Sequence, residues 1–342
     1  MPHRSPLLLL VLLLSLTCSA VGAPLRVLFI GNSYTYCNDL PGLVQAMADE
    51  KKVPMQVDSH TAGAMSLQGF LNTPQHARAR KLLANGGYDW VILQDQSQTP
   101  AYNPDNTLTA VKQWADLASA KGTKVMLFLT WAHAAEMNGK IRLQTAMQEA
   151  TSRTYCEAAV RNNTEVAPVG EAWQLWYSRK LGKQLHTDDL SHPTEAGSYL
   201  AACVIYSALT GTAPTKLPTR FKSRRMRLSA TQARELQAAA AAALRQFTPA
   251  GHLRKLAAID EARPDAVEAK ARLRRGMSRQ ELSEALGRPT AVYTEKGGRC
   301  TVQYLLRNRG ELTAYCNPGG IVESVSMTSP GAVVDIIDLS TL

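Results

Sequence analysis

Short apolar runs alternate with longer amphipathic stretches between residues 25 and 215, and this alternation limits the possible folds more than any other feature. Short apolar runs are typical of buried parallel strands, whereas a 3.6-residue period is typical of helices. Strands separated by helices predict a mostly parallel five-stranded sheet, covered on both faces in three α/β/α layers. We expect strands at Leu25–Ile30, Pro54–Ser59, Asp89–Leu93, Lys124–Thr130 and Glu165–Val169, and helices at about 39–52, 66–84, 106–121, 138–162 and 194–210.

The pattern changes after Pro214. We predict an α/β domain over 24–215, a basic, alanine-rich helical connector over 216–263 and a small α+β domain over 264–342. In the connector, Ser229-Ala-Thr-Gln232 resembles a capping box that opens a helix containing six consecutive alanines. That helix either packs on the first domain or only bridges it. The last part has two helical segments and then short strands separated by turn sequences.

The first 23 residues have the pattern of a secretory signal peptide. An apolar run over Leu7–Leu14 follows Arg4, and the small residues Val21-Gly22-Ala23 predict cleavage after Ala23. A membrane anchor is the first alternative, but the run is shorter than the roughly 20 residues that a spanning helix needs. A lipoprotein signal at Cys18 is the second, but the residues before it lack the small pair that such signals prefer. We therefore expect an exported protein, periplasmic or secreted.

The net charge of +10 is concentrated in one segment. Residues 216–275 hold 15 Lys and Arg against 5 Asp and Glu, whereas residues 24–215 are balanced. A basic protein suggests a nucleic acid or an anionic surface as partner, but no nucleic-acid motif accompanies this charge. A solvated helix face that contacts an anionic envelope polymer is the preferred interpretation, and no nucleic-acid partner is expected.

Five cysteines remain after signal cleavage, so at least one is unpaired: Cys37, Cys156, Cys203, Cys300 and Cys316. Disulfides persist outside the cytosol. Cys300 and Cys316 lie on two candidate strands joined by a turn. A cross-strand bond between them is the preferred prediction, and two buried thiols are the alternative.

Ser33 is a candidate nucleophile because it follows a predicted strand and precedes a predicted helix. A serine at such a junction has an exposed hydroxyl, and nearby backbone N–H groups can stabilise negative charge. Gly31 permits the close approach that the turn requires. Gly-Asn-Ser is also common turn composition, so this block alone is weak evidence.

Asp189 and His192 form a second block near the end of the α/β domain, directly before Pro193 and a predicted helix. Pro193 suits the first helical turn, which places His192 at the helix boundary. The aspartate can orient the imidazole, and this pair supplies the base that a serine nucleophile needs. The alternative is a helix N-terminus with polar capping residues.

The two blocks resemble the first and last motifs of the SGNH, or GDSL-like, hydrolases. Phe29-Ile-Gly-Asn-Ser-Tyr-Thr35 resembles the subgroup with Asn where the GDSL motif has Asp, and the resemblance covers about residues 25–212. It implies a flavodoxin-like SGNH fold and an esterase with the triad Ser33, His192 and Asp189. It also implies an O-acetyl group on a carbohydrate as the preferred substrate. A non-catalytic glycan-binding or envelope-scaffold protein that retains the fold is the alternative.

The family's oxyanion hole uses the serine N–H, a glycine N–H and an asparagine side chain. The resemblance assigns these roles to Ser33, to Gly63 after the second strand, and to Gln96 after the third. Gln96 stands where the family has asparagine, which is a departure from its pattern. Gln94 and Gln98 are competing choices, and any of the three could simply cap the strand end.

A second resemblance concerns the C-terminal part. Gly276-Met-Ser-x-x-Glu281 and Leu286-Gly-x-Pro289 resemble the small envelope domain of the outer-membrane assembly lipoprotein SmpA, or OmlA, over about 264–330. This resemblance implies a protein contact or envelope attachment.

The remaining polar candidates follow other strands. Trp131 and His133 are expected to line the cleft, where an aromatic ring could stack on a sugar, or else to be ordinary packing residues. His60 and His186 have no assigned role, and Cys37 lacks a local histidine partner and is read as an inert thiol. No metal-binding or phosphate-binding motif is present in the sequence, so neither a metal nor another cofactor is predicted.

Overall fold

The computed structural model describes residues 23–342 except 138–139, 180–183, 246, 288, 296, 308–309, 329–334 and 340–342. The predicted signal sequence and Cys18 therefore lie outside the described residues. In the described part, no helix is both long and apolar enough to cross a membrane.

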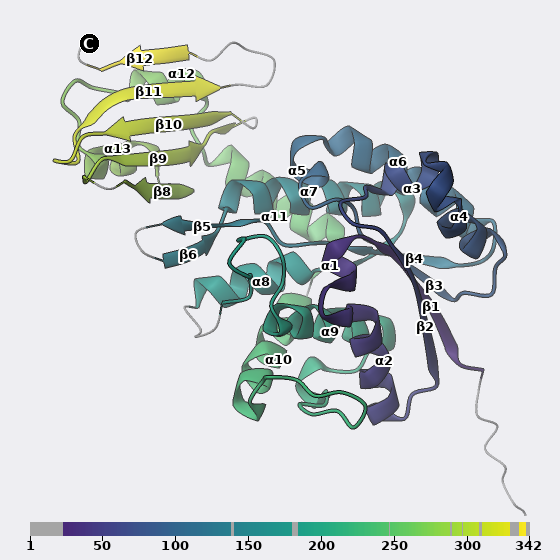
Figure 1. The fold of residues 1–342 in the computed structure, drawn as a ribbon. Coiled ribbons are helices and arrows are strands. Elements are labelled where there is room, and N and C mark those ends of the chain that lie inside the picture. Colours follow the sequence, from purple (N-terminus) through teal and green to yellow (C-terminus); the bar gives the residue numbers. More distant parts are fainter. Residues whose placement is uncertain are drawn as a thin grey trace, which may run out of the picture.

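Five strands form one parallel sheet in the order β2-β1-β3-β4-β7 (Figure 1). This is the doubly wound order of flavodoxin-like proteins, in which ligands bind where the strand order reverses, here between β1 and β3. The predicted three-layer α/β/α class is confirmed. The strands are β1 (Leu25–Gly31), β2 (Met55–Thr61), β3 (Trp90–Leu93), β4 (Lys124–Phe128) and β7 (Glu165–Ala167).

Each face of the sheet has its own helical layer and its own apolar core, because successive strand residues point to opposite faces. Val27 and Phe29 face one core, and Leu28 and Ile30 face the other. The first core is covered by α2 (Leu40–Lys51), α8 (Val169–Ser178), α9 (Glu195–Thr210) and α10 (Ala230–Leu244). The second is covered by α3 (Leu67–Asn72), α4 (Ala77–Ala84), α6 (Pro104–Ser119), α7 (Thr145–Asn162) and α11 (Pro249–Glu261).

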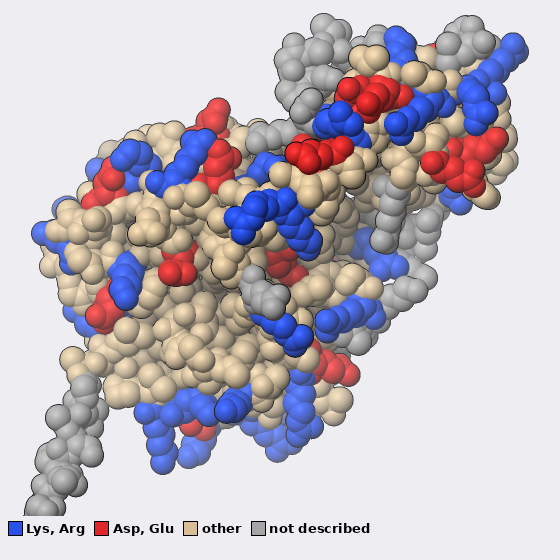
Figure 2. All heavy atoms as spheres, turned by 180° about the vertical axis from the view of Figure 1, so that it is seen from behind, with Lys and Arg blue, Asp and Glu red and all other residues tan. Residues whose placement is uncertain are grey.

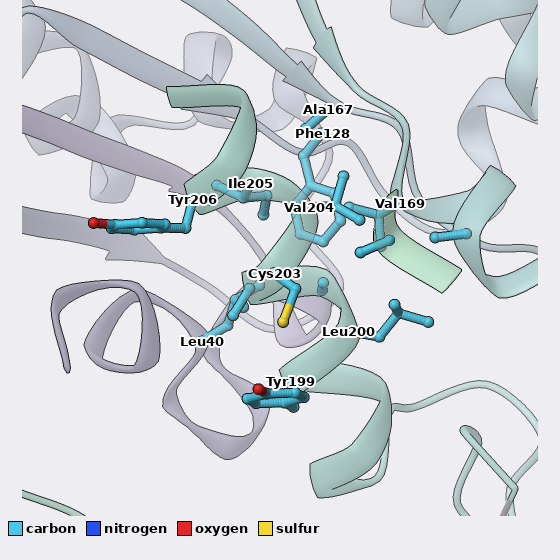
Figure 3. Packing of buried hydrophobic residues seen from close by; sticks show 14 of the residues in the cluster. Leu40, Phe128, Ala167, Val169, Tyr199, Leu200, Cys203, Val204, Ile205 and Tyr206 are labelled. Atoms are coloured by element: carbon cyan, nitrogen blue, oxygen red, sulfur yellow. The ribbon is translucent and has the colours of Figure 1, made fainter. Parts of the chain in front are cut away.

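The alanine-rich helix packs on the first domain, which decides between the two alternatives for the connector. Helix α10 buries Leu236 and four alanines against α8 and α9. Helix α9 is in turn buried along almost its whole length, with Leu200, Cys203 and Val204 inside the core (Figure 3). Alanine lets two helices approach closely, so the alanine run serves packing as well as helix formation.

Two predicted helices have different bounds from those expected. The stretch over 66–84 is divided into α3, a short 3₁₀ turn and α4, because Pro74 ends the first helix. Within the stretch over 138–162, Lys140–Leu143 form strand β6, which pairs antiparallel with β5 (Ala134–Met137), and α7 starts only at Thr145.

The C-terminal unit is an antiparallel meander of five strands with two helices and a separate core. Capping boxes begin both α12 (Ala266–Ala271) and α13 (Arg279–Leu286). The sheet order is β12-β11-β10-β9-β8. The strands are β8 (Ala291–Thr294), β9 (Cys300–Leu305), β10 (Glu311–Cys316), β11 (Val322–Thr328) and β12 (Asp335–Asp338).

Cys300 and Cys316 are directly opposite one another on β9 and β10, as the strand prediction required. Both are buried free thiols, and so are Cys156 and Cys203. The structure thus corresponds to the alternative of two buried thiols rather than to the preferred disulfide.

Basic side chains gather along the edge of the molecule formed by α2 and α10 (Figure 2). The segment before α10 contributes exposed Lys222, Arg225 and Arg227. The predicted concentration of positive charge after residue 216 is therefore present at the surface.

Candidate active site

The nucleophile candidate lies where β1 meets a short helix. β1 ends at Gly31 and α1 begins at Ser33, which is partly exposed at the carboxyl end of the sheet. A Cβ atom on Gly31 would lie 2.4 Å from Thr35 Oγ1 and 2.6 Å from Gln94 Oε1, so the turn requires glycine. The same Gln94 oxygen accepts a hydrogen bond from the Asn32 N–H at 2.8 Å, which fixes the peptide before the serine.

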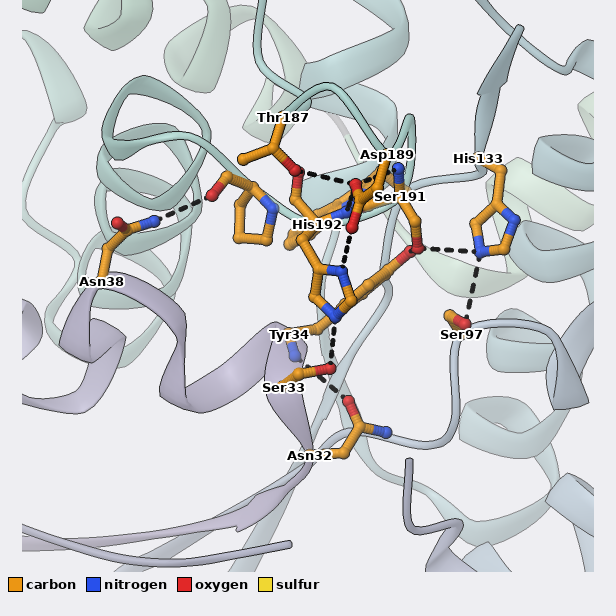
Figure 4. A network of polar contacts seen from close by, with 12 residues as sticks. Asn32, Ser33, Tyr34, Asn38, Ser97, His133, Thr187, Asp189, Ser191 and His192 are labelled. Carbon is orange, nitrogen blue, oxygen red and sulfur yellow. Dashed lines mark hydrogen bonds and ion pairs between the residues drawn. The ribbon is translucent and has the colours of Figure 1, made fainter. Parts of the chain in front are cut away.

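Ser33, His192 and Asp189 form a hydrogen-bonded chain (Figure 4). Ser33 Oγ is 2.8 Å from His192 Nε2, although the two residues are 159 positions apart. Asp189 Oδ2 is 2.5 Å from His192 Nδ1. The structure thus brings together the three residues that the sequence singled out, in the geometry of a nucleophile, a base and an orienting carboxylate.

The Asp189 carboxylate is held by its own loop. Its Oδ1 atom accepts hydrogen bonds from the Thr187 hydroxyl at 2.7 Å and from the Ser191 and His192 N–H groups, both at 2.9 Å. Partial burial raises the pKa of Asp189, but the bonds from His192 and these neighbours outweigh it and lower the pKa below its ordinary value. Leu190 has a φ of 60°, so the loop is held in a strained conformation between the two catalytic candidates.

The placement of Pro193 corrects the predicted helix boundary. Helix α9 begins at Glu195, and Thr194 is its N-cap, with a hydroxyl that accepts from the Gly197 N–H at 3.3 Å. The Thr194 N–H donates to the Leu185 carbonyl oxygen at 2.8 Å, which keeps Pro193 in extended backbone before the helix. His192 is therefore anchored by the loop rather than by the first helical turn.

Trp131 does not line the cleft. It is fully buried, with Tyr34 stacked on one ring face at 4.5 Å and Trp173 on the other at 3.9 Å. Its indole N–H donates to the Ser191 carbonyl oxygen at 3.0 Å. Both ring faces are covered, so stacking on a sugar is excluded, and Trp131 instead supports the loop that carries His192.

Tyr34, Ser191, His133 and Ser97 form a chain of polar contacts beside the triad, which we call the polar wall (Figure 4). The Tyr34 and Ser191 hydroxyls are 2.9 Å apart, and His133 Nε2 is 3.1 Å from Ser191 Oγ and 3.3 Å from Ser97 Oγ. Burial lowers the pKa of His133, so its imidazole is neutral at neutral pH. Only His133 was a candidate in the sequence, because isolated Ser and Tyr residues carry no pattern.

The three glutamines after β3 have different environments. Gln94 is fully buried beneath the Ser33 turn, and Gln98 is exposed. Gln96 Oε1 accepts from the Gln98 and Thr99 N–H groups at 2.7 and 3.0 Å, which caps α5 (Thr99–Tyr102). Because these bonds hold the Gln96 amide oxygen towards the helix, the amide nitrogen Nε2 is on the other side. Nε2 donates a hydrogen bond to Ser97 Oγ at 3.3 Å.

Two backbone N–H groups complete the candidate oxyanion hole. Within the described residues, neither the Ser33 N–H nor the Gly63 N–H has a hydrogen-bond acceptor. Gly63 is exposed and lies against α1, where a Cβ atom would be 3.4 Å from the Tyr36 hydroxyl. Free N–H groups beside a nucleophile are the donors that stabilise an oxyanion.

Asp95 organises the surroundings of these donors and was not identified from the sequence. It is fully buried, and its Oδ1 atom accepts from the Leu67 and Gln96 N–H groups, both at 2.8 Å. Its Oδ2 atom accepts from the Thr107 hydroxyl at 2.6 Å. Burial raises the pKa of Asp95 although these bonds oppose the shift. The residue joins the segment after β2 to the end of β3, and its position two residues after a buried strand was the available signal.

The other titratable candidates are structural. His186 is buried between the Tyr177 hydroxyl, 2.8 Å from Nδ1, and the Ala132 carbonyl oxygen, 3.1 Å from Nε2. His60 packs edge-on against Phe70. Burial and the Asp189 charge raise the pKa of the Cys37 thiol, which disfavours the reactive thiolate. Among the described residues, no group of three or more His, Cys, Asp or Glu side chains could hold a metal ion.

The fold and the triad together define a candidate serine-hydrolase site. No protein-family model and no curated protein matches this sequence. A solved structure described as a DUF4886 family protein from Bacteroides uniformis is similar at 20% identity and a TM-score of 0.54, covering 66% of this chain and 96% of that chain. This similarity shows a shared fold.

Two further solved structures are described as hydrolases. A putative SGNH hydrolase from Slackia heliotrinireducens is 27% identical, with a TM-score of 0.46, covering 54% of this chain and 99% of that chain. An acetyl xylan esterase is 14% identical, with a TM-score of 0.44 and the same coverages.

Proposed function

We propose that this chain is a serine esterase in which Ser33 is the nucleophile, His192 the general base and Asp189 the residue that orients it. The contact of 2.8 Å between Ser33 Oγ and His192 Nε2 carries this proposal. It brings together two residues from opposite ends of the domain at the sheet edge where doubly wound proteins bind ligands. A structural serine at a turn has no need of an oriented imidazole.

The mechanism is two-step acyl transfer. His192 Nε2 takes the Ser33 proton as Oγ attacks the ester carbonyl carbon, and the imidazolium that forms is stabilised by the ionised Asp189. His192 then returns the proton to the leaving alcohol as the acyl-oxygen bond breaks. In the second step His192 activates a water molecule, which releases the acid and restores Ser33.

The oxyanion of each tetrahedral intermediate is held by three donors. These are the Ser33 and Gly63 N–H groups and the Gln96 side-chain amide. Two observations support Gln96 over its neighbours: its oxygen is fixed by two backbone donors, and Gln94 is fully buried beneath the turn. A preorganised amide of this kind stabilises the oxyanion without reorienting during the reaction.

The proposed substrate is an O-acetyl group on a carbohydrate, and the protein is proposed to act after export. Residues 1–23 support export, because they have the pattern of a signal peptide. The polar wall supports an alcohol portion rich in hydroxyl groups, because it presents side chains that both donate and accept hydrogen bonds beside the triad.

Hydrolysis of p-nitrophenyl acetate tests the esterase proposal. Ser33→Ala is expected to lower kcat by roughly 10³-fold or more, because it removes the nucleophile. Ser119→Ala is the matched control, since Ser119 is exposed at the far end of α6. If the folded wild type and Ser33→Ala are equally active, or equally inert on this and on acetylated glycans, the triad proposal fails. Equal inertness would favour the non-catalytic glycan-binding alternative.

A further inference from the structure

A cavity of about 350 Å³ lies between the α/β unit and the C-terminal sheet, outside the triad. Helix α5 and the first turns of α7 line it from the α/β unit, and residues of β8, β9 and β10 line it from the C-terminal sheet. The lining includes the polar and aromatic residues Tyr102, Gln144, Glu149, Arg153, Arg263 and Tyr293.

The two walls of this cavity are fastened to each other. Arg263, just after α11, donates to both carboxylate oxygens of Glu149 on α7 at 2.8 Å, and both side chains are largely buried. Arg307 of the C-terminal unit donates through Nε to the Arg263 carbonyl oxygen at 3.0 Å, and through its backbone N–H to the Pro264 carbonyl oxygen at 2.9 Å. Hydrogen bonds between two charged groups are stronger than neutral ones, and burial shields this pair from solvent. The cavity therefore has a defined shape.

The cavity adjoins the polar wall. The Gln144 N–H donates to the His133 carbonyl oxygen at 3.0 Å, and the His133 N–H contacts Met147 Sδ at 3.3 Å. Gln144 and Met147 both line the cavity. On the other side, Gln96 caps α5, whose last residue, Tyr102, lines the cavity as well. Ser97 and Tyr102 thus come from one segment of the chain, and His133, Gln144 and Met147 come from another. Each segment contributes first to the polar wall and, a few residues further along, to the cavity lining.

The charge of the lining disfavours both an anion and a lipid tail. Two arginines are outnumbered by three carboxylates in the lining, and Arg263 is already paired with Glu149. A polyanion would meet excess negative charge, and an acyl chain would desolvate charged groups without compensation.

The aromatic lining favours a sugar. Tyr102 on α5 is 66% exposed, and Tyr293 on β8 lines the same cavity from the C-terminal sheet. Tyrosine offers an apolar face and a hydroxyl in one side chain, and Gln144 and Gln303 add amides to the lining. A pyranose ring presents the matching surface, with C–H faces and hydroxyl edges.

We propose that this cavity binds sugar units of an oligosaccharide whose O-acetyl group lies at Ser33, so that the C-terminal unit forms part of the substrate site. This inference rests on the esterase function proposed above, and it assigns the second unit a role in recognising chain length.

The test compares the full chain and its variants on O-acetylated xylo-oligosaccharides of graded length and on p-nitrophenyl acetate. Wild-type kcat/KM should rise with oligosaccharide length. Tyr102→Ala and Tyr293→Ala should each lower kcat/KM for the long oligosaccharides by roughly three- to tenfold, while leaving p-nitrophenyl acetate hydrolysis unchanged. Tyr315→Ala is the matched control, because Tyr315 is an exposed tyrosine on β10 outside the cavity lining.

The outcomes separate this inference from the esterase proposal. Activity on p-nitrophenyl acetate without a length effect, or equal losses on both substrates in the tyrosine variants, would overturn the cavity assignment and leave the esterase standing. If no ester is hydrolysed, calorimetry of xylohexaose with the folded wild type decides: binding that Tyr102→Ala weakens supports the sugar site, and no binding overturns it.

Discussion

The side-chain amide of Asn38 donates to the Pro193 carbonyl oxygen at 2.9 Å and lies equally close to Ser198 Oγ, joining the nucleophile segment to the loop that carries His192 (Figure 4). Asn38 follows α1 in a left-handed conformation, with a φ of 55°, and Asp39 repeats it with a φ of 52°. Two consecutive left-handed residues are costly, and they place the amide against the opposite segment. This contact fixes how far Ser33 lies from His192.

Asn38→Ala should therefore lower kcat on p-nitrophenyl acetate by roughly tenfold or more, because small displacements of a base strongly reduce catalysis. KM should change little, since Asn38 is a positioning residue that does not touch substrate. Asn72→Ala, at the exposed end of α3, is the control. A loss of thermal stability with unchanged kcat would assign Asn38 a structural role only.

Arg224 supports the same turn from outside the predicted α/β domain. Its guanidinium donates to the Asn38 carbonyl oxygen at 2.8 Å and to the Asp39 carbonyl oxygen at 3.2 Å. Arg224→Ala should lower kcat several-fold with a small change in KM, whereas the exposed neighbour Arg225→Ala should have no effect. Equal kinetics for the two variants would show that the turn holds without this contact.

Gln96→Ala should reduce kcat by roughly tenfold or more if its amide stabilises the oxyanion. Gln98→Ala should remain at the wild-type rate, because the Gln98 side chain is exposed. Gln96 also caps α5, so the unfolding temperature must be measured in parallel. A stable Gln96→Ala variant with full kcat would remove Gln96 from the oxyanion hole.

His186 should make the protein sensitive to acid. Burial lowers the pKa of His186 from its ordinary value to about 4, so the folded state binds a proton there less readily than the unfolded chain. The contribution of neutral His186 to the free energy of unfolding is therefore fully present above about pH 6.5. It is lost as the pH falls towards 4, which lowers the free energy of unfolding by up to about 3 kcal/mol. Thermal unfolding between pH 4 and 8 should show a smaller dependence on pH in His186→Gln. If the unfolding temperatures of the wild type and of His186→Gln depend on pH in the same way, His186 is not the source of the acid sensitivity.

The sheet and the proximity of Ser33, His192 and Asp189 could be predicted because their determinants are local or ordered along the chain. Apolar runs indicated β1, β3 and β4, with weaker signals for β2 and β7, and the order of Ser33, Asp189 and His192 indicated the candidate site. The surroundings could not be predicted in this way. Trp131 looked like a cleft residue because nothing near it in sequence indicates that Tyr34 and Trp173 cover its two faces.

The same limit applies to supporting residues. Asp95 and Asn38 act through backbone groups of segments far away in the chain, and such pairings leave no periodic pattern. Strand β6 was included in the predicted helix over 138–162 because a strand of four residues also fits a helical period over a short window.

The packing of α10 and α11 on the α/β unit determines where this chain can be divided. A fragment ending at residue 215 would lose Leu236 and the alanines that cover α8 and α9, as well as Phe247 and Leu253, which pack on the opposite core. Uncovered apolar faces of that size favour aggregation. Cooperative melting and the yield of folded protein should therefore be retained only in truncations that extend at least through Glu261, so the shortest useful expression fragment is longer than the α/β pattern alone suggests.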